Sequence, residues 1–396
     1  MLNERPARLA PLIKYPGGKE RELKYILPAL PADAERFFDP FVGGGSVYLA
    51  ADADEFYIND FSAELMLLWS CVKDRDAAFF ADADAFSAAW DFLGQTAEAH
   101  RWELICLYQY CARPQIIERG IEEPLDGMLD RMIADAWPDY PAGTLLHGWW
   151  KSPEWKDELL KSFVNKFRRM NELEEEKGLL TAEDCFKNIE TCLKNAFYMY
   201  IRGIYNRSAE LRLSDGTRAA LYFFIREYCY SSMFRYNAHH EFNVPYGGIS
   251  YNHKSLSGKI AAMRAPELAA KLAKTGLGRE DFAAFLDRYA PGPKDFVFVD
   301  PPYDTTFSSY DGSAFGKEDQ KRLADWLCEK CGSRFLLIIK NTEYIRSLYP
   351  EGRPTKGGEP LRLYQFDKKY YVSFMARNDR KSEHLMIANY ALPEIL

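Results

Sequence analysis

The stretch FVFVDPPY, residues 296–303, places an acid, two prolines and an aromatic ring directly after an apolar run. The apolar run predicts a short buried strand, which Pro301 and Pro302 end because proline has no N–H to donate to a sheet ladder. The Asp300 carboxylate and the Pro301 carbonyl, which is free of any ladder, can each accept a hydrogen bond from an amino group. Tyr303 can stack its ring on a flat partner. Because ligands of open α/β sheets bind at the carboxyl ends of strands, the stretch predicts a binding site.

A glycine-rich segment, DPFVGGGS at residues 39–46, follows the short run RFF and precedes a helical pattern. Glycines at such a turn let the backbone approach a ligand closely. Tyr48 stands where a dinucleotide fingerprint has its third glycine, and in the loop YPGGKE Glu20 replaces the hydroxyl residue of a phosphate loop. The next run, FYIND, ends at Asp60, where an α/β fold places an acid that binds ribose hydroxyls. Together these features favour a nucleoside ligand without a polyphosphate.

The elements that must position these residues form an α/β core. The runs RFFD, FYIND, FVFVD and FLLIIKN are apolar or β-rich, end at Asp or Asn, and are followed in several cases by helical patterns, which predicts successive parallel strands. We assign residues 1–72 and 277–396 to this core. Residues 73–276 contain long helical patterns with mixed charges and are predicted to be an inserted, mostly helical domain.

Composition limits the possible classes of protein. The chain has 396 residues, of which 47% are hydrophobic, which predicts a globular protein. Its net charge of −7 argues against a protein that coats nucleic acid indiscriminately but leaves a local basic face possible. No apolar run is long enough to cross a bilayer, and the first residues, MLNERPARLAPLIKY, lack the apolar region of a signal peptide, so we expect a cytoplasmic protein without a membrane partner. The pair Cys328 and Cys331 has no second pair at zinc-site spacing, so we expect no metal.

In their order and spacing, these motifs resemble those of Dam-type DNA adenine methyltransferases of the D12 class. The family's W-x-G-G-K segment corresponds to residues 15–19, its D-P-F-x-G-x-G-S segment to residues 39–46, its ribose-binding acid to Asp60, and its D-P-P-Y tetrad to residues 300–303. Residues 235–237 and 242–247 are similar to the family's R-Y-N and F-N-V-P-F-G segments, and residues 380–390 are similar to its closing strand.

The resemblance implies a Rossmann-like methyltransferase core with an inserted helical target-recognition domain, S-adenosylmethionine as the cofactor and double-stranded DNA as the partner. It implies transfer of a methyl group to N6 of a flipped-out adenine at a specific short sequence. The expected catalytic residues are Asp300, Pro301, Pro302 and Tyr303. The expected cofactor-binding residues are Tyr15, Gly17, Gly18, Lys19, Asp39, Pro40, Phe41, Gly43, Gly45, Ser46, Asp60, Asp281, Phe282 and Asp300. The expected DNA-binding residues are Tyr230, Ser231, Arg235, Asn237, Asn243 and Pro245.

Several features depart from the family pattern or extend it. Tyr15 replaces a tryptophan, and YSSMFRYN at residues 230–237 lacks the asparagine and glycine of the family's Y-N-G-x-x-R-Y-N. Residues 73–220 are longer than the family's recognition domain, so the target sequence stays open. Arginines interleaved with aromatics suggest a face that meets phosphates, with Arg235 as the candidate base reader; they are Arg202, Arg207, Arg212, Arg218, Arg226 and Arg235. Residues 368–381 are a second basic stretch, and residues 304–314 suggest either a lid or a surface loop.

Two alternatives remain at this stage. Methyltransferases that act on cytosine N4, on RNA adenine or on a glutamine amide also use an x-P-P-Y tetrad, although an aspartate at position 300 favours DNA adenine. A DNA-binding relative without catalysis would show a broken cofactor loop, whereas these motifs are intact. The sequence leaves open the oligomeric state, with a monomer as one option. It also leaves open whether the protein serves host regulation, restriction-modification or a phage.

Overall fold

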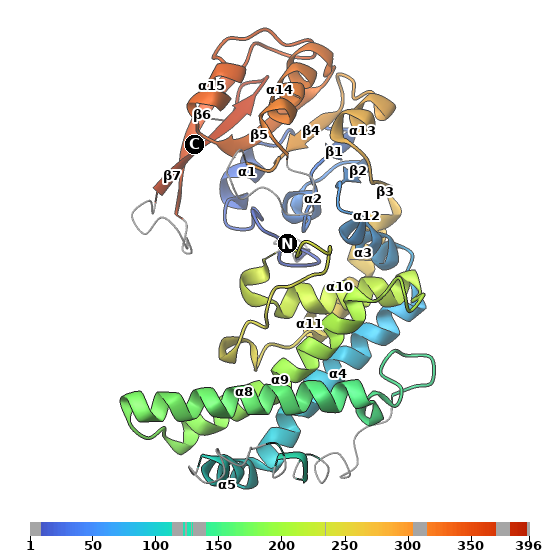
Figure 1. The fold of residues 1–396 in the computed structure, drawn as a ribbon. Coiled ribbons are helices and arrows are strands. Elements are labelled where there is room, and N and C mark those ends of the chain that lie inside the picture. The colour runs from blue at the N-terminus through green and yellow to red at the C-terminus, as the bar shows by residue number, and fades with distance from the viewer. Residues whose placement is uncertain are drawn as a thin grey trace, which may run out of the picture. The chain divides into compact units, whose positions relative to one another are not determined.

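The computed structural model describes residues 9–112, 140–233, 235–303, 315–369 and 381–393, together with positions 122, 125–127 and 129. The chain divides into two compact units (Figure 1). The first, called the sheet unit, combines Met1–Lys73 with Ala262–Leu396, and the second, called the helical unit, is Asp74–Ala261. The suggested lid at 304–314 and most of the basic stretch at 368–381 lie outside the described residues.

A seven-stranded sheet, in the order β3-β2-β1-β4-β5-β7-β6, organises the described part of the sheet unit. Strands β1 to β5 pair in parallel, and β7 runs antiparallel to both β5 and β6. All four residues of β4 are buried, as expected for a central parallel strand covered on both faces. The strands are β1 (Arg36–Asp39), β2 (Glu55–Asn59), β3 (Thr275–Gly278), β4 (Phe296–Val299), β5 (Arg334–Lys340), β6 (Arg362–Lys369) and β7 (Lys381–Ala388).

The strand order reverses between β1 and β4. From β1 the chain proceeds outward through β2 to β3, and from β4 it proceeds in the other direction to β5. The two strands are parallel neighbours, so their carboxyl ends lie at the same edge of the sheet. Such a switch point is where doubly wound sheets bind their ligands. Asp39 ends β1 and Asp300 follows β4 directly, so both acids lie at this switch point.

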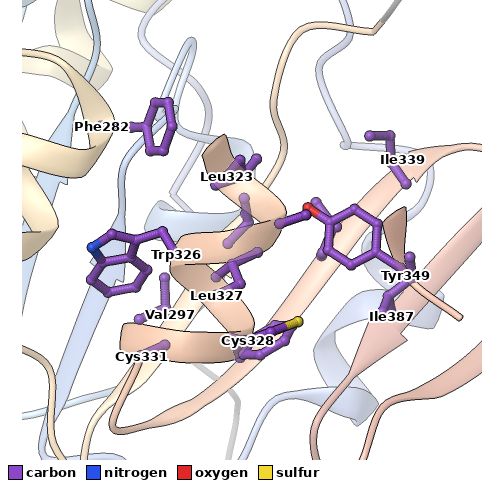
Figure 2. Packing of buried hydrophobic residues seen from close by; sticks show 14 of the residues in the cluster. Phe282, Val297, Leu323, Trp326, Leu327, Cys328, Cys331, Ile339, Tyr349 and Ile387 are labelled. Atoms are coloured by element: carbon purple, nitrogen blue, oxygen red, sulfur yellow. The ribbon is translucent and has the colours of Figure 1, made fainter. Parts of the chain in front are cut away.

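Helices of the sheet unit cover the sheet and contribute to its core. They are α1 (Leu23–Ala29), α2 (Ser46–Ala50), α3 (Ala63–Lys73), α12 (Pro266–Ala273), α13 (Phe282–Tyr289), α14 (Lys317–Asp325) and α15 (Glu343–Leu348). Figure 2 shows Leu323 and Leu327, from α14 and the π-helical turn Trp326–Lys330 after it, packed near Val297 of β4. Cys328 and Cys331 belong to the same core, and burial raises the pKa of the Cys328 thiol to about 11.

Helices make up most of the helical unit, in which an aromatic core contains Trp90, Phe197 and Phe224. Ser152, Thr181 and Ser214 each accept a backbone N–H from the first turn of the following helix, which fixes where those helices begin. The helices are α4 (Ala77–Ala99), α5 (Arg101–Cys111), α8 (Pro153–Lys177), α9 (Ala182–Asn206) and α10 (Asp215–Tyr228), with short 3₁₀ turns at Trp149–Lys151, Tyr230–Ser232 and Ile249–Tyr251. Helix α11 (Ser257–Met263) contains the boundary between the two units. None of the described helices is both long and apolar enough to span a bilayer.

The second segment of the sheet unit begins at Ala262, earlier than the expected position 277. The difference arises because α12 and β3 belong to the sheet unit. Strand β3 pairs with β2 from Thr275 onward and forms one edge of the sheet.

Candidate active site

The turn after β1, residues 43–45, has a backbone conformation that requires glycine. Gly43 has φ +50° and Gly45 has φ +82°, both in the left-handed region. A Cβ on Gly45 would come within 2.7 Å of the Trp69 ring, whose Nε1 donates a hydrogen bond to the Gly43 carbonyl at 3.2 Å. The glycine turn is therefore held against α3, with its backbone at the switch point.

The amino-terminal loop, residues 15–19, packs against the glycine turn. A Cβ on Gly43 would lie 3.0 Å from Cδ1 of Tyr15, and one on Gly18 would lie 3.6 Å from the Ser46 hydroxyl. Gly17 has φ +80° and open space where a Cβ would be. The structure thus brings together two of the predicted cofactor segments.

Two polar residues at the end of β2 organise this edge of the sheet. Asp60 accepts the Gly43 N–H at 3.1 Å and the Ser62 N–H at 3.0 Å. Asn59 donates to the carbonyls of Pro40 and Glu280 and accepts the Glu280 N–H at 3.0 Å. Asn59 thereby ties together the chain segments that follow β1 and β3. Our sequence prediction missed Asn59, although an amide at a strand's last buried position is a signal that could have revealed it.

Lys19 forms an ion pair with the predicted catalytic acid. Its ammonium donates to both Asp300 carboxylate oxygens at 2.5 Å and to the Gly17 carbonyl at 2.8 Å. The Lys19 side chain is 2% exposed and that of Asp300 is 17% exposed, so the pair is largely shielded from water. The amino-terminal loop is therefore connected directly to the turn after β4.

Asp39 is a buried acid at the same edge. Burial raises the pKa of the Asp39 carboxyl well above its ordinary value of 3.8, and the negative charges of Asp300 and Asp60 raise it further. The Phe41 N–H and the Lys19 ammonium act in the opposite direction but do not cancel the effect. A raised pKa favours the neutral form of Asp39, so the negative charge at this edge comes mainly from Asp60 and Asp300.

The Tyr303 ring packs against buried groups. It makes an edge contact with the His384 ring of β7, at a centroid distance of 5.4 Å, and the Lys19 ammonium lies 5.4 Å from its centroid. Burial, followed by the charges of Asp300 and Glu22, raises the pKa of the Tyr303 hydroxyl well above 10. His384 is fully buried, and apart from its place in the closing strand nothing in the sequence indicates its contact with Tyr303.

The two prolines of the turn differ in their hydrogen bonding. The Pro302 carbonyl accepts a hydrogen bond from Nε2 of Gln320 at 2.7 Å. Among the described residues, nothing donates to the Pro301 carbonyl. The Pro301 oxygen thus meets the requirement of the predicted second acceptor, and Gln320 is a contact that the sequence did not indicate.

Asp281 and Phe282 lie where α13 begins. The Asp281 carboxylate caps this helix through the Ala283 N–H at 3.0 Å and pairs with Arg322 at 2.9 Å. The Phe282 side chain is 4% exposed and packs between the rings of Phe41 and Phe315. Because its ring belongs to the core, Phe282 has mainly its backbone to offer to a ligand.

The predicted DNA-binding residues lie in one region of the helical unit. Arg235 donates from Nε to the Asn243 side chain at 2.9 Å, and the Tyr230 N–H donates to the Pro245 carbonyl at 2.8 Å. Asn237 donates to the Glu241 carboxylate at 2.8 Å across the turn of the same hairpin. The side chain of Arg235 is exposed. These contacts form a short hairpin, residues 235–246, next to the 3₁₀ turn Tyr230–Ser232.

Ser231 and Ser232 both have a left-handed backbone, with φ of +52° and +53°. Asparagine and glycine adopt this conformation most easily, so the serines keep the shape expected of the family's Asn-Gly pair at some cost in strain. The Ser232 carbonyl is held by Nη1 of Arg226 at 3.0 Å. The departure in sequence is therefore compatible with the same local backbone.

Two of the predicted phosphate-contacting arginines have structural contacts instead. Arg226 is fully buried beneath the Tyr230–Ser232 turn, so the prediction that it faces phosphates is wrong. Arg202 donates to the Val244 carbonyl at 3.1 Å and supports the hairpin from α9. The sequence pattern failed here because arginines interleaved with aromatics also occur where a guanidinium satisfies buried carbonyls. Arg207, Arg212 and Arg235 are exposed, and Arg218 pairs with Asp215.

Comparison with known proteins identifies the family. The sequence model described as "D12 class N6 adenine-specific DNA methyltransferase" matches residues 15–93 and 165–359, more than half of the chain. This chain belongs to that family. The matched ranges contain the amino-terminal loop, the glycine turn, Asp60, the hairpin and the turn after β4. Residues 94–164, which include α5, lie outside the matched ranges.

Individual methyltransferases match part of the chain. A protein of Paramecium bursaria Chlorella virus NC1A named Type II methyltransferase M.CviBI is 30% identical over 176 residues, covering 43% of this chain and 61% of the relative. The DNA N-6-adenine-methyltransferase of Escherichia phage P1 is 32% identical over 162 residues, covering 38% of this chain and 20% of the relative. The Retron Ec67 DNA adenine methylase of Escherichia coli is also 32% identical over 162 residues, covering 40% of this chain and 53% of the relative. The matches thus span between one fifth and about three fifths of these relatives.

Proposed function

We propose that this chain transfers the methyl group of S-adenosylmethionine to N6 of an adenine in double-stranded DNA. The observation that carries the proposal is the position of the Asp300 carboxylate, at the carboxyl end of β4 and paired with Lys19 of the loop that packs on the glycine turn. An acceptor for an amino group and a backbone cradle for a nucleoside thus lie at one switch point. Membership in the D12 class and the names of the relatives support the same reaction.

The residues at the glycine turn fit S-adenosylmethionine. This cofactor supplies a methyl group activated by a positively charged sulfonium, and its amino acid portion carries an ammonium. Asp60 lies at the glycine turn, and its carboxylate gives this part of the site the negative charge that such a ligand needs. We assign the ribose hydroxyls to Asp60, whose carboxylate already accepts the Gly43 N–H, and the close approach of the nucleoside to the backbone of residues 43–45, which carry no side chains of their own. We assign residues 15–19 and the start of α13 to the same cofactor site.

The target amino group needs two acceptors, because the lone pair of adenine N6 is delocalised into the ring. We assign one acceptor to the Asp300 carboxylate and the other to the Pro301 carbonyl, since the Pro302 carbonyl is already bonded to Gln320. A carboxylate oxygen can accept more than one hydrogen bond, so Asp300 can hold the amino group while Lys19 remains nearby. Its negative charge also stabilises the positive charge that develops on the nitrogen during transfer.

Tyr303 provides the stacking face for the flipped base. Moving a base out of the duplex costs a few kcal/mol, and stacking on an aromatic ring returns about 1–3 kcal/mol. Because the Tyr303 ring is fixed against His384, it is ordered before the base arrives. Holding the nitrogen, the methyl carbon and the sulfur in line supplies much of the acceleration, about 7–11 kcal/mol in favourable cases.

Recognition of DNA is assigned to the helical unit. Tyr230, Ser231, Arg235, Asn237, Asn243 and Pro245 lie together on the hairpin and the adjoining turn. The exposed guanidinium of Arg235 can donate two hydrogen bonds to a guanine edge, so we keep it as the base reader. The Tyr230 side chain is 37% exposed at the start of the adjoining 3₁₀ turn, and we assign it to insertion into the base stack. The helical unit would thus select a short sequence at which the sheet unit methylates adenine.

The test is transfer of tritiated methyl from S-adenosylmethionine to unmethylated genomic DNA. We expect incorporation at adenine, loss of incorporation in Asp300→Ala and Asp300→Asn, and retained cofactor binding by calorimetry in both variants. Asp295→Asn is the matched control, because Asp295 lies at the other end of β4 in an ion pair with Arg36. Methyl transfer confined to cytosine or to RNA would reject the substrate, and an active Asp300→Asn enzyme would reject the assigned acceptor.

A further inference from the structure

The turn after β4 lacks backbone donors at two successive positions. Neither Pro301 nor Pro302 carries an N–H, so the turn cannot be fixed by hydrogen bonds that these residues donate. The proline rings fix φ at both positions but leave the ψ rotations free. The direction of the Pro302 carbonyl depends on ψ of Pro302, and the same rotation sets the course of the chain into Tyr303. A donor to this carbonyl from elsewhere in the fold would therefore fix the backbone from which the Tyr303 side chain projects.

Gln320 of α14 is such a donor. Its Nε2 lies 2.7 Å from the Pro302 oxygen, and its side chain is fully buried. Helix α14 is anchored by Leu323, one turn away from Gln320, in the core that also contains Val297 of β4 (Figure 2). The amide is therefore fixed to the same strand whose end it supports.

The other half of the amide is unsatisfied. Oε1 of Gln320 is buried and has no hydrogen-bond partner in the described part of the chain. A buried acceptor without a partner lowers stability, and an apolar side chain of similar length would avoid that loss. A glutamine that only filled space would therefore lower stability at this position. A need for its N–H donor explains why a glutamine is present.

We propose that Gln320 is a positioning residue for methyl transfer. By holding the Pro302 peptide plane, it fixes the separation between the two acceptors, Asp300 and Pro301, and the stacking face of Tyr303. A base held between them then presents its amino group in one orientation. This role rests on the proposed function, because it concerns the same amino group and the same turn.

The test compares Gln320→Met, which keeps the length of the side chain but removes the donor, with wild type in single-turnover methylation of unmethylated genomic DNA. We expect the rate of methyl transfer to fall about 100-fold, the effect of misplacing a reacting group by about 1 Å. Stability should be equal or higher, and the Kd for S-adenosylmethionine should not change. Leu323→Ala is the packing control: it should destabilise the fold and leave the transfer rate of the folded enzyme near wild type.

The outcomes separate this proposal from the one on which it rests. A wild-type protein that methylates no DNA would overturn both the proposed function and the positioning role. An active wild type with an equally fast Gln320→Met variant would overturn the positioning role alone. A similar loss of transfer rate in the folded Leu323→Ala variant would also overturn it, because general loosening of α14 would then explain the effect.

Discussion

Replacing Lys19 with methionine removes the ammonium that donates to both carboxylate oxygens of Asp300 at 2.5 Å. The two side chains are 2% and 17% exposed, so the remaining carboxylate would be left largely desolvated and without its counter-charge. Loss of one partner from a buried ion pair costs about 3–5 kcal/mol. Because Asp300 keeps some contact with solvent, we expect about 3 kcal/mol, at the lower end of that range.

The double variant Lys19→Met/Asp300→Asn removes both charges and should recover most of that loss. Replacing a buried pair by neutral groups is often close to neutral for stability, because the cost of desolvating two ions disappears with them. Together with both single variants it forms a double-mutant cycle, which isolates the coupling between the two residues. Hydrogen exchange of peptides from β1 and β4 measures the opening free energy of the sheet unit without requiring the whole chain to unfold in one step.

Two results would refute this reasoning. If peptides from β1 and β4 are as well protected from hydrogen exchange in Lys19→Met as in wild type, the ion pair contributes nothing to the stability of the switch point. If the double variant is as unstable as the sum of the single variants, the two side chains act independently and the observed contact is not an energetic one. Asp295→Asn, which breaks the separate pair with Arg36 at the other end of β4, controls for general damage to the strand.

Two further predictions concern the cofactor edge. The pKa of Asp39 is raised above 3.8 in the folded state. The contribution of this carboxyl to stability is therefore fully present below pH 3.8 and is lost as the pH rises through the folded-state pKa. In melting curves from pH 4 to 9 without cofactor, the stability of Asp39→Asn relative to wild type should therefore increase with rising pH. The variant should also bind S-adenosylmethionine more weakly. A difference in stability that stays constant across this pH range would contradict the prediction. Gly45→Ala should destabilise the fold more than Gly17→Ala in urea titrations. Both substitutions strain a left-handed residue by about 1–2 kcal/mol, but only the Cβ at position 45 meets the Trp69 ring, at 2.7 Å. Equal losses of stability would show that the Trp69 ring moves aside without cost.

Much of the sheet could be predicted from the sequence. The runs RFFD, FYIND, FVFVD and FLLIIKN are confirmed as the parallel strands β1, β2, β4 and β5. Their burial on both faces leaves a local signature of consecutive apolar residues that ends at a polar one. Strand β3, TGLG, lacks that signature, because two glycines at a sheet edge give little β propensity. Its place in the sheet could be recognised only from its pairing with β2.

Local sequence determined which chemical groups arrive at the switch point, because the residue type at a strand end depends on only a few neighbouring residues. These groups are an acid and two prolines after one strand, glycines after another and an acid after a third. The tertiary structure alone decided which groups meet there. Lys19 and Asp300 are 281 residues apart, and Gln320 reaches Pro302 from a different helix, so neither contact leaves a periodic trace in the chain. Burial likewise separated Arg226, which holds a carbonyl inside the helical unit, from Arg235, which remains exposed. Such pairings depend on how whole elements pack, and packing is the sum of many distant contacts that no short stretch of sequence contains.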